Sequence, residues 1–151
     1  MVNPNGRPLQ SPSTWPAALA DQVGPPTSAP QSGASEFERA WVFLAPSVAR
    51  SGEHTKSSVL AALGRGTRKL WLTDECAVIT EIVDHPSGLR TGNMWLGGGK
   101  LEAILGLFPR MEAWMVAHGA TESRINGRRG WLRTTGYREF RTVIKKDLRH
   151  V

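Results

Sequence analysis

With 151 residues, of which 40% are hydrophobic, the chain is long enough to form one domain with a buried core. No apolar run approaches the ~20 residues that a transmembrane helix needs, so no membrane partner is expected. Cys76 is the single cysteine, which excludes an internal disulfide and favours a reducing compartment. The formal net charge of +6 favours anionic partners.

The first 34 residues differ in composition from the rest of the chain. They hold seven of the ten prolines and a single acidic residue. A segment so poor in apolar residues does not offset the entropy of its own ordering. Residues 1–34 are therefore predicted to form an extended Pro/Ser-rich arm, and residues 35–151 the folded domain. Trp15 and Leu19 lie four residues apart in the arm, so they can share one face of a helical turn and bind a partner.

Two helices open the predicted domain. Ser35 is followed three residues later by Glu38, the pattern of a capping box, so the first helix is predicted to begin there. Pro46 interrupts its apolar stripe and is expected to end or bend it. A second helix is predicted over residues 55–63, with Val59, Leu60 and Leu63 facing inward.

Three strands with short connections are predicted at residues 69–73, 77–83 and 89–96. The connections are rich in Asp, Glu, Pro, Ser and Gly, so an antiparallel meander is the natural pairing. Glu81 lies in the middle of the second strand, between apolar residues. It is either a buried carboxylate that serves as a general base, or a strand residue that points into solvent.

A helical stripe from Leu101 to Met115 predicts a long helix that ends at Gly119. A strand at residues 123–126, a short helix ending at Gly136 and a final strand at residues 138–145 complete the order. Two helices, a three-strand meander and then alternating helices and strands indicate an α/β fold, a three-layer sandwich with a central mixed sheet.

The glycines Gly97–Gly99 stand between a predicted strand and a predicted helix, with Lys100 after them. A glycine loop that opens a helix brings backbone N–H groups to an anionic group, usually a phosphate. The same glycines are also explained by a turn that only redirects the chain. Both interpretations remain open at this stage.

The C-terminal region is strongly basic. Between residues 122 and 149, nine Lys and Arg residues oppose three acidic ones, so this region carries as much net charge as the whole chain. Such a region favours nucleic acid, an acidic protein surface or the phosphates of a cofactor; a solvated polar face is the alternative. The predicted partner-binding residues of this region are Arg128, Arg129 and Arg133.

Four short segments carry a family resemblance: Trp-Leu-Gly-Gly at 95–98, Glu-Ala-Trp at 112–114, Gly-Arg-Arg-Gly-Trp at 127–131 and Lys-Lys-Asp-Leu at 145–148. Together with the element order, they resemble the GNAT-type N-acetyltransferases, and most closely the small GNAT-like proteins of tailed phages and prophages. The resemblance covers roughly the last two-thirds of the chain. It implies a GNAT-like fold.

The resemblance also implies a cofactor site, in which the glycine segment holds the pyrophosphate of acetyl-CoA. Two positions depart from the family pattern. Met94 stands where these enzymes have Arg or Gln, and Leu132 stands where many have the Tyr that protonates the leaving thiolate. If acetyl-CoA binds, the residues that would hold it are Leu96, Gly97, Gly98, Gly99 and Lys100.

Other catalytic side chains are few. Glu81 is the best candidate for the base that deprotonates an amine. His85 and His118 lie at a predicted turn and a predicted helix end, where solvent exposure is expected. No spacing of His, Cys and carboxylates predicts a metal site.

These observations favour a non-enzymatic, virion-associated protein of a tailed phage, assembled in the host cytoplasm and docked on portal, tail or capsid proteins by its arm and its basic C-terminal face. No cofactor is expected in that role, and a homo-oligomer is compatible with it. The alternative is an acetyl-CoA-dependent N-acetyltransferase of the bacterial cytoplasm that acts on a protein or a small amine. Direct DNA contact through the basic region is a third hypothesis.

Overall fold

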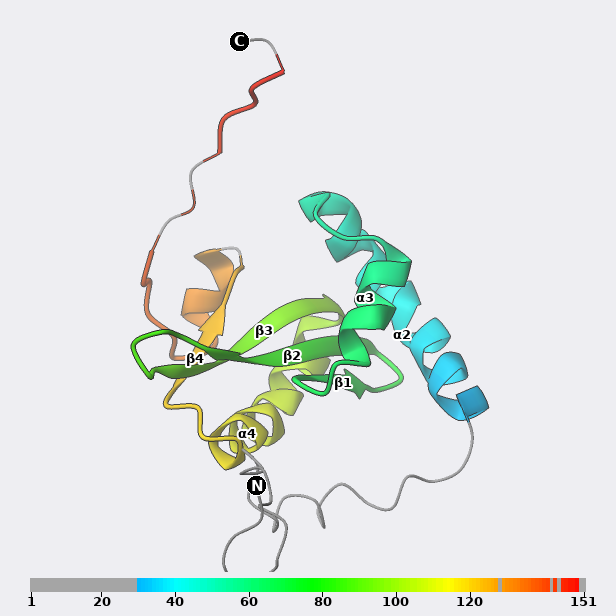
Figure 1. Ribbon diagram of the computed structural model, residues 1–151, viewed down its shortest axis with the longest axis horizontal. Helices are drawn as coiled ribbons and strands as arrows, with labels where there is room; N and C mark the ends of the chain where they lie inside the picture. The colour runs from blue at the N-terminus through cyan, green and yellow to red at the C-terminus, as the bar shows by residue number, and fades with distance from the viewer. Residues whose placement is uncertain (1–29, 128, 142, 144, 150–151) are drawn as a thin grey trace, which may run out of the picture.

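The computed structural model describes residues 30–127, 129–141, 143 and 145–149, and the predicted arm lies outside them except for its last residues (Figure 1). In chain order the elements are the helices α2 (Pro30–Ser51) and α3 (Lys56–Leu63), the strands β1 (Arg68–Leu72), β2 (Cys76–Asp84) and β3 (Arg90–Gly99), helix α4 (Leu101–Ala117), strand β4 (Glu122–Ile125) and the 3₁₀ helix η1 (Arg129–Arg133).

The strands form one four-stranded sheet in the order β1-β2-β3-β4. The pairs β1–β2 and β2–β3 are antiparallel, which confirms the predicted meander. After α4 the chain returns as β4, which runs parallel to β3. The sheet is therefore mixed, as the sequence predicted.

Helices cover both faces of the sheet and divide the core in two (Figure 1). On one face, α4 packs Ile104, Phe108 and Met111 against Val78 and Met94 of the sheet. On the other face, α2 and α3 pack on the sheet. The buried residues of this second core are Phe37, Ala40, Leu44, Val48, Val59, Ala77, Ile79 and Leu96. The α/β class and the helices on both faces agree with the prediction.

The first helices depart from their predicted details. Helix α2 begins at Pro30 rather than at Ser35, and it continues through Pro46 to Ser51. Helix α3 begins after Thr55, whose hydroxyl accepts from the Ser58 N–H in a capping box. Leu60 was predicted to face inward, but it is 48% exposed, because Val59 and Ala62 provide the buried positions of this short helix.

The predicted final strand is wrong. No described residue between 134 and 149 belongs to a strand, and the segment leaves the domain as an extended chain (Figure 1). Its alternation of apolar and polar residues fits a strand, but a strand also needs a neighbour to accept its backbone hydrogen bonds. Its contact with β4 is made by side chains, with the Arg124 guanidinium 4.7 Å from the Phe140 ring centre. None of the helices formed by the described residues is long and apolar enough to cross a lipid bilayer.

Candidate functional site

A row of polar residues crosses all four strands at one level of the sheet. Arg68 of β1 lies opposite Glu81 of β2, Glu81 lies opposite Asn93 of β3, and Asn93 lies opposite Arg124 of β4. Residues directly opposite each other on paired strands point to the same face. Glu81 follows buried Ile79 by two positions, so the row lies on the α2/α3 face, beside the apolar core there.

Both oxygens of the Glu81 carboxylate are occupied. One accepts from the Arg68 guanidinium at 2.8 Å, and the other accepts from the Asn93 amide at 3.2 Å. The side chains of Arg68 and Glu81 are only 21% and 14% exposed. Water therefore screens this ion pair less than it screens a surface pair. Glu81 therefore does not point into solvent but is the acceptor of a half-buried network, and its role as a general base stays a prediction.

A β-bulge at Trp95 completes this network. Ile79 pairs with Leu96 and Thr80 pairs with Met94, so Trp95 is an extra residue in β3. A bulge re-aims a side chain. Here the Arg68 guanidinium lies over the Trp95 indole, 4.4 Å from the centre of the ring. The His54 ring packs edge-on against the same indole, with the two ring centres 4.9 Å apart. Sequence reasoning missed this contact, because strand alternation does not reveal where an extra residue is inserted.

The three glycines are part of β3 and not of a loop. Gly97–Gly99 pair with residues 76–78 of β2. At Gly98 a side chain would meet the Phe43 carbonyl oxygen of α2 at 1.9 Å, so glycine lets the helix backbone lie directly on the sheet. Gly99 has φ +111°, a conformation that only glycine adopts readily. Helix packing and backbone conformation explain these two glycines without a ligand.

The flanking cofactor candidates also have structural contacts. Leu96 belongs to the core under α2. Lys100 precedes the first turn of α4; its backbone N–H donates to the Glu75 carbonyl at 3.0 Å, and its ammonium pairs with the Glu75 carboxylate. The hydrogen bond that the ammonium donates to the Glu75 carboxylate, together with the charge of that carboxylate, raises the pKa of Lys100. The predicted cofactor residues are therefore contiguous in space, at the junction of β3 and α4.

Two of the C-terminal candidates lie in η1. Arg129 pairs with Glu139 at 3.2 Å, and Arg133 is exposed at the end of η1. Trp15, Leu19 and Arg128 lie outside the described residues. The structure thus brings no two of these predicted partner-binding residues into a described contact.

Tyr137 lies on the α4 side of the sheet, packed against Phe108 in the core there. Its hydroxyl contacts the Ser123 hydroxyl at 2.5 Å and donates to Glu112 at 3.1 Å. Burial, with Glu112 nearby, raises the pKa of Tyr137 to about 12. Leu132 is 37% exposed.

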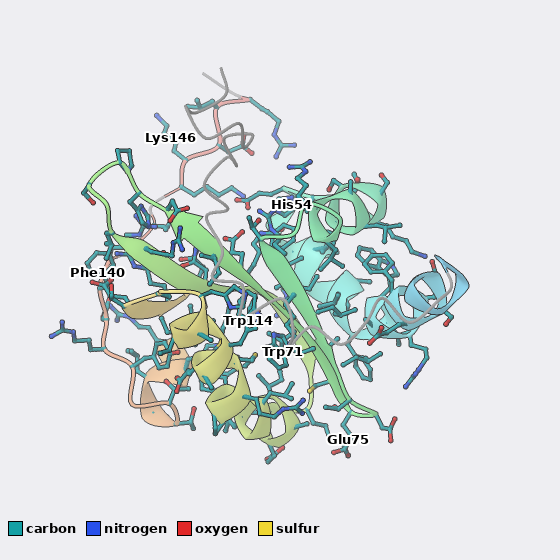
Figure 2. The ribbon with its side chains drawn as sticks, turned by 60° about the horizontal axis from the view of Figure 1, so that its bottom comes forward. His54, Trp71, Glu75, Trp114, Phe140 and Lys146 are labelled. Atoms are coloured by element: carbon teal, nitrogen blue, oxygen red, sulfur yellow. The ribbon has the colours of Figure 1, made fainter. Side chains whose placement is uncertain are left out.

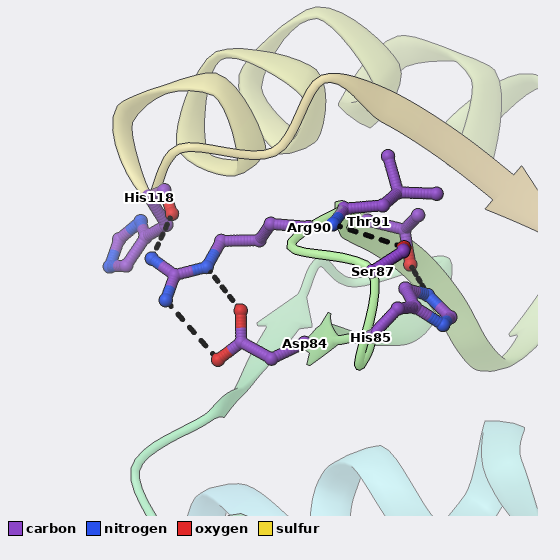
Figure 3. Close-up of polar contacts among 7 residues, drawn as sticks. Asp84, His85, Ser87, Arg90, Thr91 and His118 are labelled. Carbon is purple, nitrogen blue, oxygen red and sulfur yellow. Dashed lines mark hydrogen bonds and ion pairs between the residues drawn. The ribbon is translucent and has the colours of Figure 1, made fainter.

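Both histidines that were expected to be exposed are half-buried. Figure 3 shows the polar contacts around them. The His85 Nε2 lies 3.0 Å from the Thr91 hydroxyl. The backbone carbonyl of His118 accepts from Arg90, which also forms a two-pronged ion pair with Asp84. This pairing lowers the pKa of Asp84. Arg90 therefore ties the β2–β3 turn to the end of α4, while the His85 contact lies within the β2–β3 hairpin.

Within the described part of the chain, no group of three or more His, Cys, Asp or Glu residues is placed to hold a metal ion. A surface hollow lies between α2 and the β1–β2 turn, and no predicted site residue lines it. Its lining residues are Arg39, Val42, Phe43, Leu72, Thr73 and Asp74. Comparisons with protein-family models, with curated proteins and with solved structures give no match to this chain.

Proposed function

We propose that this chain is a docking protein built on a GNAT-like fold, a virion-associated protein of a tailed phage rather than an acetyltransferase. One observation carries the proposal: the carboxylate best placed for a general base is already engaged. Glu81 already accepts from Arg68 and from Asn93, so both of its oxygens serve the contacts between the strands rather than a bound amine. The general acid is also missing from its expected position, because Leu132 stands where the resemblance implies a Tyr, and a leucine side chain has no acidic proton.

The glycine segment supports the same role. A pyrophosphate cradle uses glycines so that the backbone can approach a ligand. At Gly98 that approach is made by the Phe43 carbonyl of α2 instead. On this side of β3, helix α2 occupies the space that a cofactor would need. Retention of a fold after loss of its chemistry is a familiar outcome, since a fold does not fix a function.

The element order supports the GNAT-like assignment. The observed order is two helices, an antiparallel meander of three strands, a helix, and a strand parallel to β3. This is the order that the resemblance implies, except that the final strand is absent from the described residues. The assignment to phage particles rests on the four sequence segments that resemble phage proteins.

The C-terminal segment supports docking on protein. Phe140, Val143 and Leu148 are 69%, 79% and 68% exposed. Large apolar side chains left in water along an extended segment mark an interaction site. They alternate with basic residues, so the preferred partner surface combines apolar pockets with acidic groups. The basic residues are Arg138, Arg141, Lys145, Lys146 and Arg149.

Mass spectrometry of purified particles tests the docking role. The chain is expected at a fixed ratio to the other particle proteins. A chain in which Phe140 and Val143 are replaced by serine should be under-represented in particles, while a control with Val42→Ser and Leu60→Ser, two exposed residues of α2 and α3, should be incorporated normally. Absence of the wild-type chain from particles would remove the proposal.

One observation favours the acetyltransferase as a second candidate. Strand β3 pairs with β4 only from Thr91 to Met94, and beyond Met94 it pairs with β2 alone. In the described part of the chain, the backbone of residues 95–99 therefore has no strand on its other side. Backbone N–H groups of this kind can bind an acyl carbonyl. Transfer of acetyl groups from acetyl-CoA to amines by the purified protein, lost in Glu81→Gln, would establish this candidate.

A further inference from the structure

Two cations share one indole ring at the β1 edge of the sheet. The Lys69 ammonium lies 4.2 Å from the Trp71 ring centre, and the Arg110 guanidinium lies 5.7 Å from it. Lys69 and Trp71 are two residues apart on β1, so both face α4, from which Arg110 extends. Trp71 meets Trp114 of α4 edge-on, with ring centres 6.3 Å apart (Figure 2).

Neither cation has a carboxylate partner among the residues that the structure describes. By contrast, Arg68, Arg90 and Lys100 each pair with an acidic residue. Burial and the charge of Arg110 lower the pKa of Lys69. Two like charges held close together without a counter-charge destabilise the fold, and a bound anion relieves that repulsion.

We propose that Lys69 and Arg110, held at the Trp71 indole, bind a carboxylate-bearing segment of a partner protein. The guanidinium offers the donor fork that matches a carboxylate, and the ammonium adds a second donor. The site consists of β1 and α4 alone. It therefore does not depend on the docking role proposed for the C-terminal segment.

The surroundings favour an acidic protein segment over nucleic acid. A nucleic acid needs a run of cations along its backbone and open aromatic faces for its bases. This site has two cations, and Trp71 is 6% exposed, so its ring offers no free face. Ala113 and Ala117 follow Arg110 along α4 and are exposed. Their short side chains allow a partner backbone to come close beside the cations.

The test is a titration of the full chain with an oligoglutamate peptide, followed by NMR. The indole N–H signals of Trp71 and Trp114 are expected to shift, and the pKa of Lys69 is expected to rise as the peptide binds. The double variant K69Q/R110Q should weaken the binding measured at these signals about tenfold or more, since removal of a paired charge lowers affinity strongly.

The matched control is R50Q/R65Q, which removes the same net charge from two exposed arginines of α2 and of the segment after α3. It should change the affinity less than about twofold, because screened charges at a distance contribute little. Equal losses in both double variants, or indole signals and a Lys69 pKa that do not move, would overturn the proposal. So would an oligothymidine strand that shifts the same signals at a lower concentration than oligoglutamate. The Lys69 titration in the wild-type chain keeps the test valid even if K69Q/R110Q fails to fold.

Discussion

Replacement of Gly98 by alanine tests why a run of glycines ends β3. The added methyl group would lie 1.9 Å from the Phe43 carbonyl oxygen and 2.9 Å from its carbonyl carbon. Both atoms belong to the backbone of α2, so no rotamer change removes the clash. Helix α2 would have to shift away from the sheet.

The cost follows from what α2 buries. Its residues Phe37, Ala40, Leu44 and Val48 are 0–5% exposed, so any shift loosens the core under this helix. Overpacking of this kind lowers the free energy of unfolding by about 1–3 kcal/mol. For a domain of this size, each kcal/mol corresponds to a decrease of roughly 2–4 °C in the melting temperature.

Gly97→Ala is the matched control. There the added methyl group would meet Val78 at 3.7 Å, an ordinary contact, so the free energy of unfolding should change by less than about 0.5 kcal/mol. Urea unfolding followed by tryptophan fluorescence measures both variants. Equal stability of Gly98→Ala and Gly97→Ala would refute the packing explanation, and a loss of acetyl-CoA binding in both at unchanged stability would favour a cofactor cradle.

Three further measurements probe the network, the lone tyrosine and the cap of α3. Glu81→Gln leaves the Arg68 charge half-buried without a counter-charge, so the free energy of unfolding in urea should fall by about 1–2 kcal/mol, and an unchanged value would show that the pair contributes nothing. Tyr137 has a pKa of about 12 in the folded chain against 10.0 ordinarily. The stability that neutral Tyr137 contributes is therefore complete below pH 10 and is lost as the pH rises to 12. Tyrosinate absorbance reports this residue alone, because Tyr137 is the only tyrosine of the chain. Tyr137→Phe should reduce the loss of stability at alkaline pH. Thr55→Ala removes the hydroxyl that caps α3 and should cost about 1 kcal/mol in the same urea assay, whereas Ser57→Ala, next to the cap, should cost less.

Local signals in the sequence predicted most of the fold. The turn residues at 73–75 and 84–88 predicted the meander, because short connections of this kind join neighbouring antiparallel strands. The apolar stripe from Leu101 to Met115 predicted α4 and most of its buried face, although Leu101 itself is 42% exposed. Each of these signals lies within a few residues of the structure that it predicts.

The errors concern contacts between distant residues. Nothing near Gly98 in the sequence indicates that the Phe43 carbonyl lies against it, so a packed strand was mistaken for a loop. The pairing of Arg68 with Glu81 depends on strand register, and the indole under Arg68 depends on the bulge at Trp95. The strand predicted at 138–145 has the right alternation, but alternation does not supply a neighbouring strand.

The most direct measurement is the thermal unfolding of the full chain with and without millimolar acetyl-CoA. A ligand that binds only the folded state, at ~100 times its Kd, adds about 2.7 kcal/mol to the free energy of unfolding. A docking protein whose candidate base is held by Arg68 and whose strand glycines accommodate α2 should unfold at the same temperature with and without the cofactor. An increase of several degrees that a substitution at Lys100 abolishes would contradict this account and favour the acetyltransferase candidate.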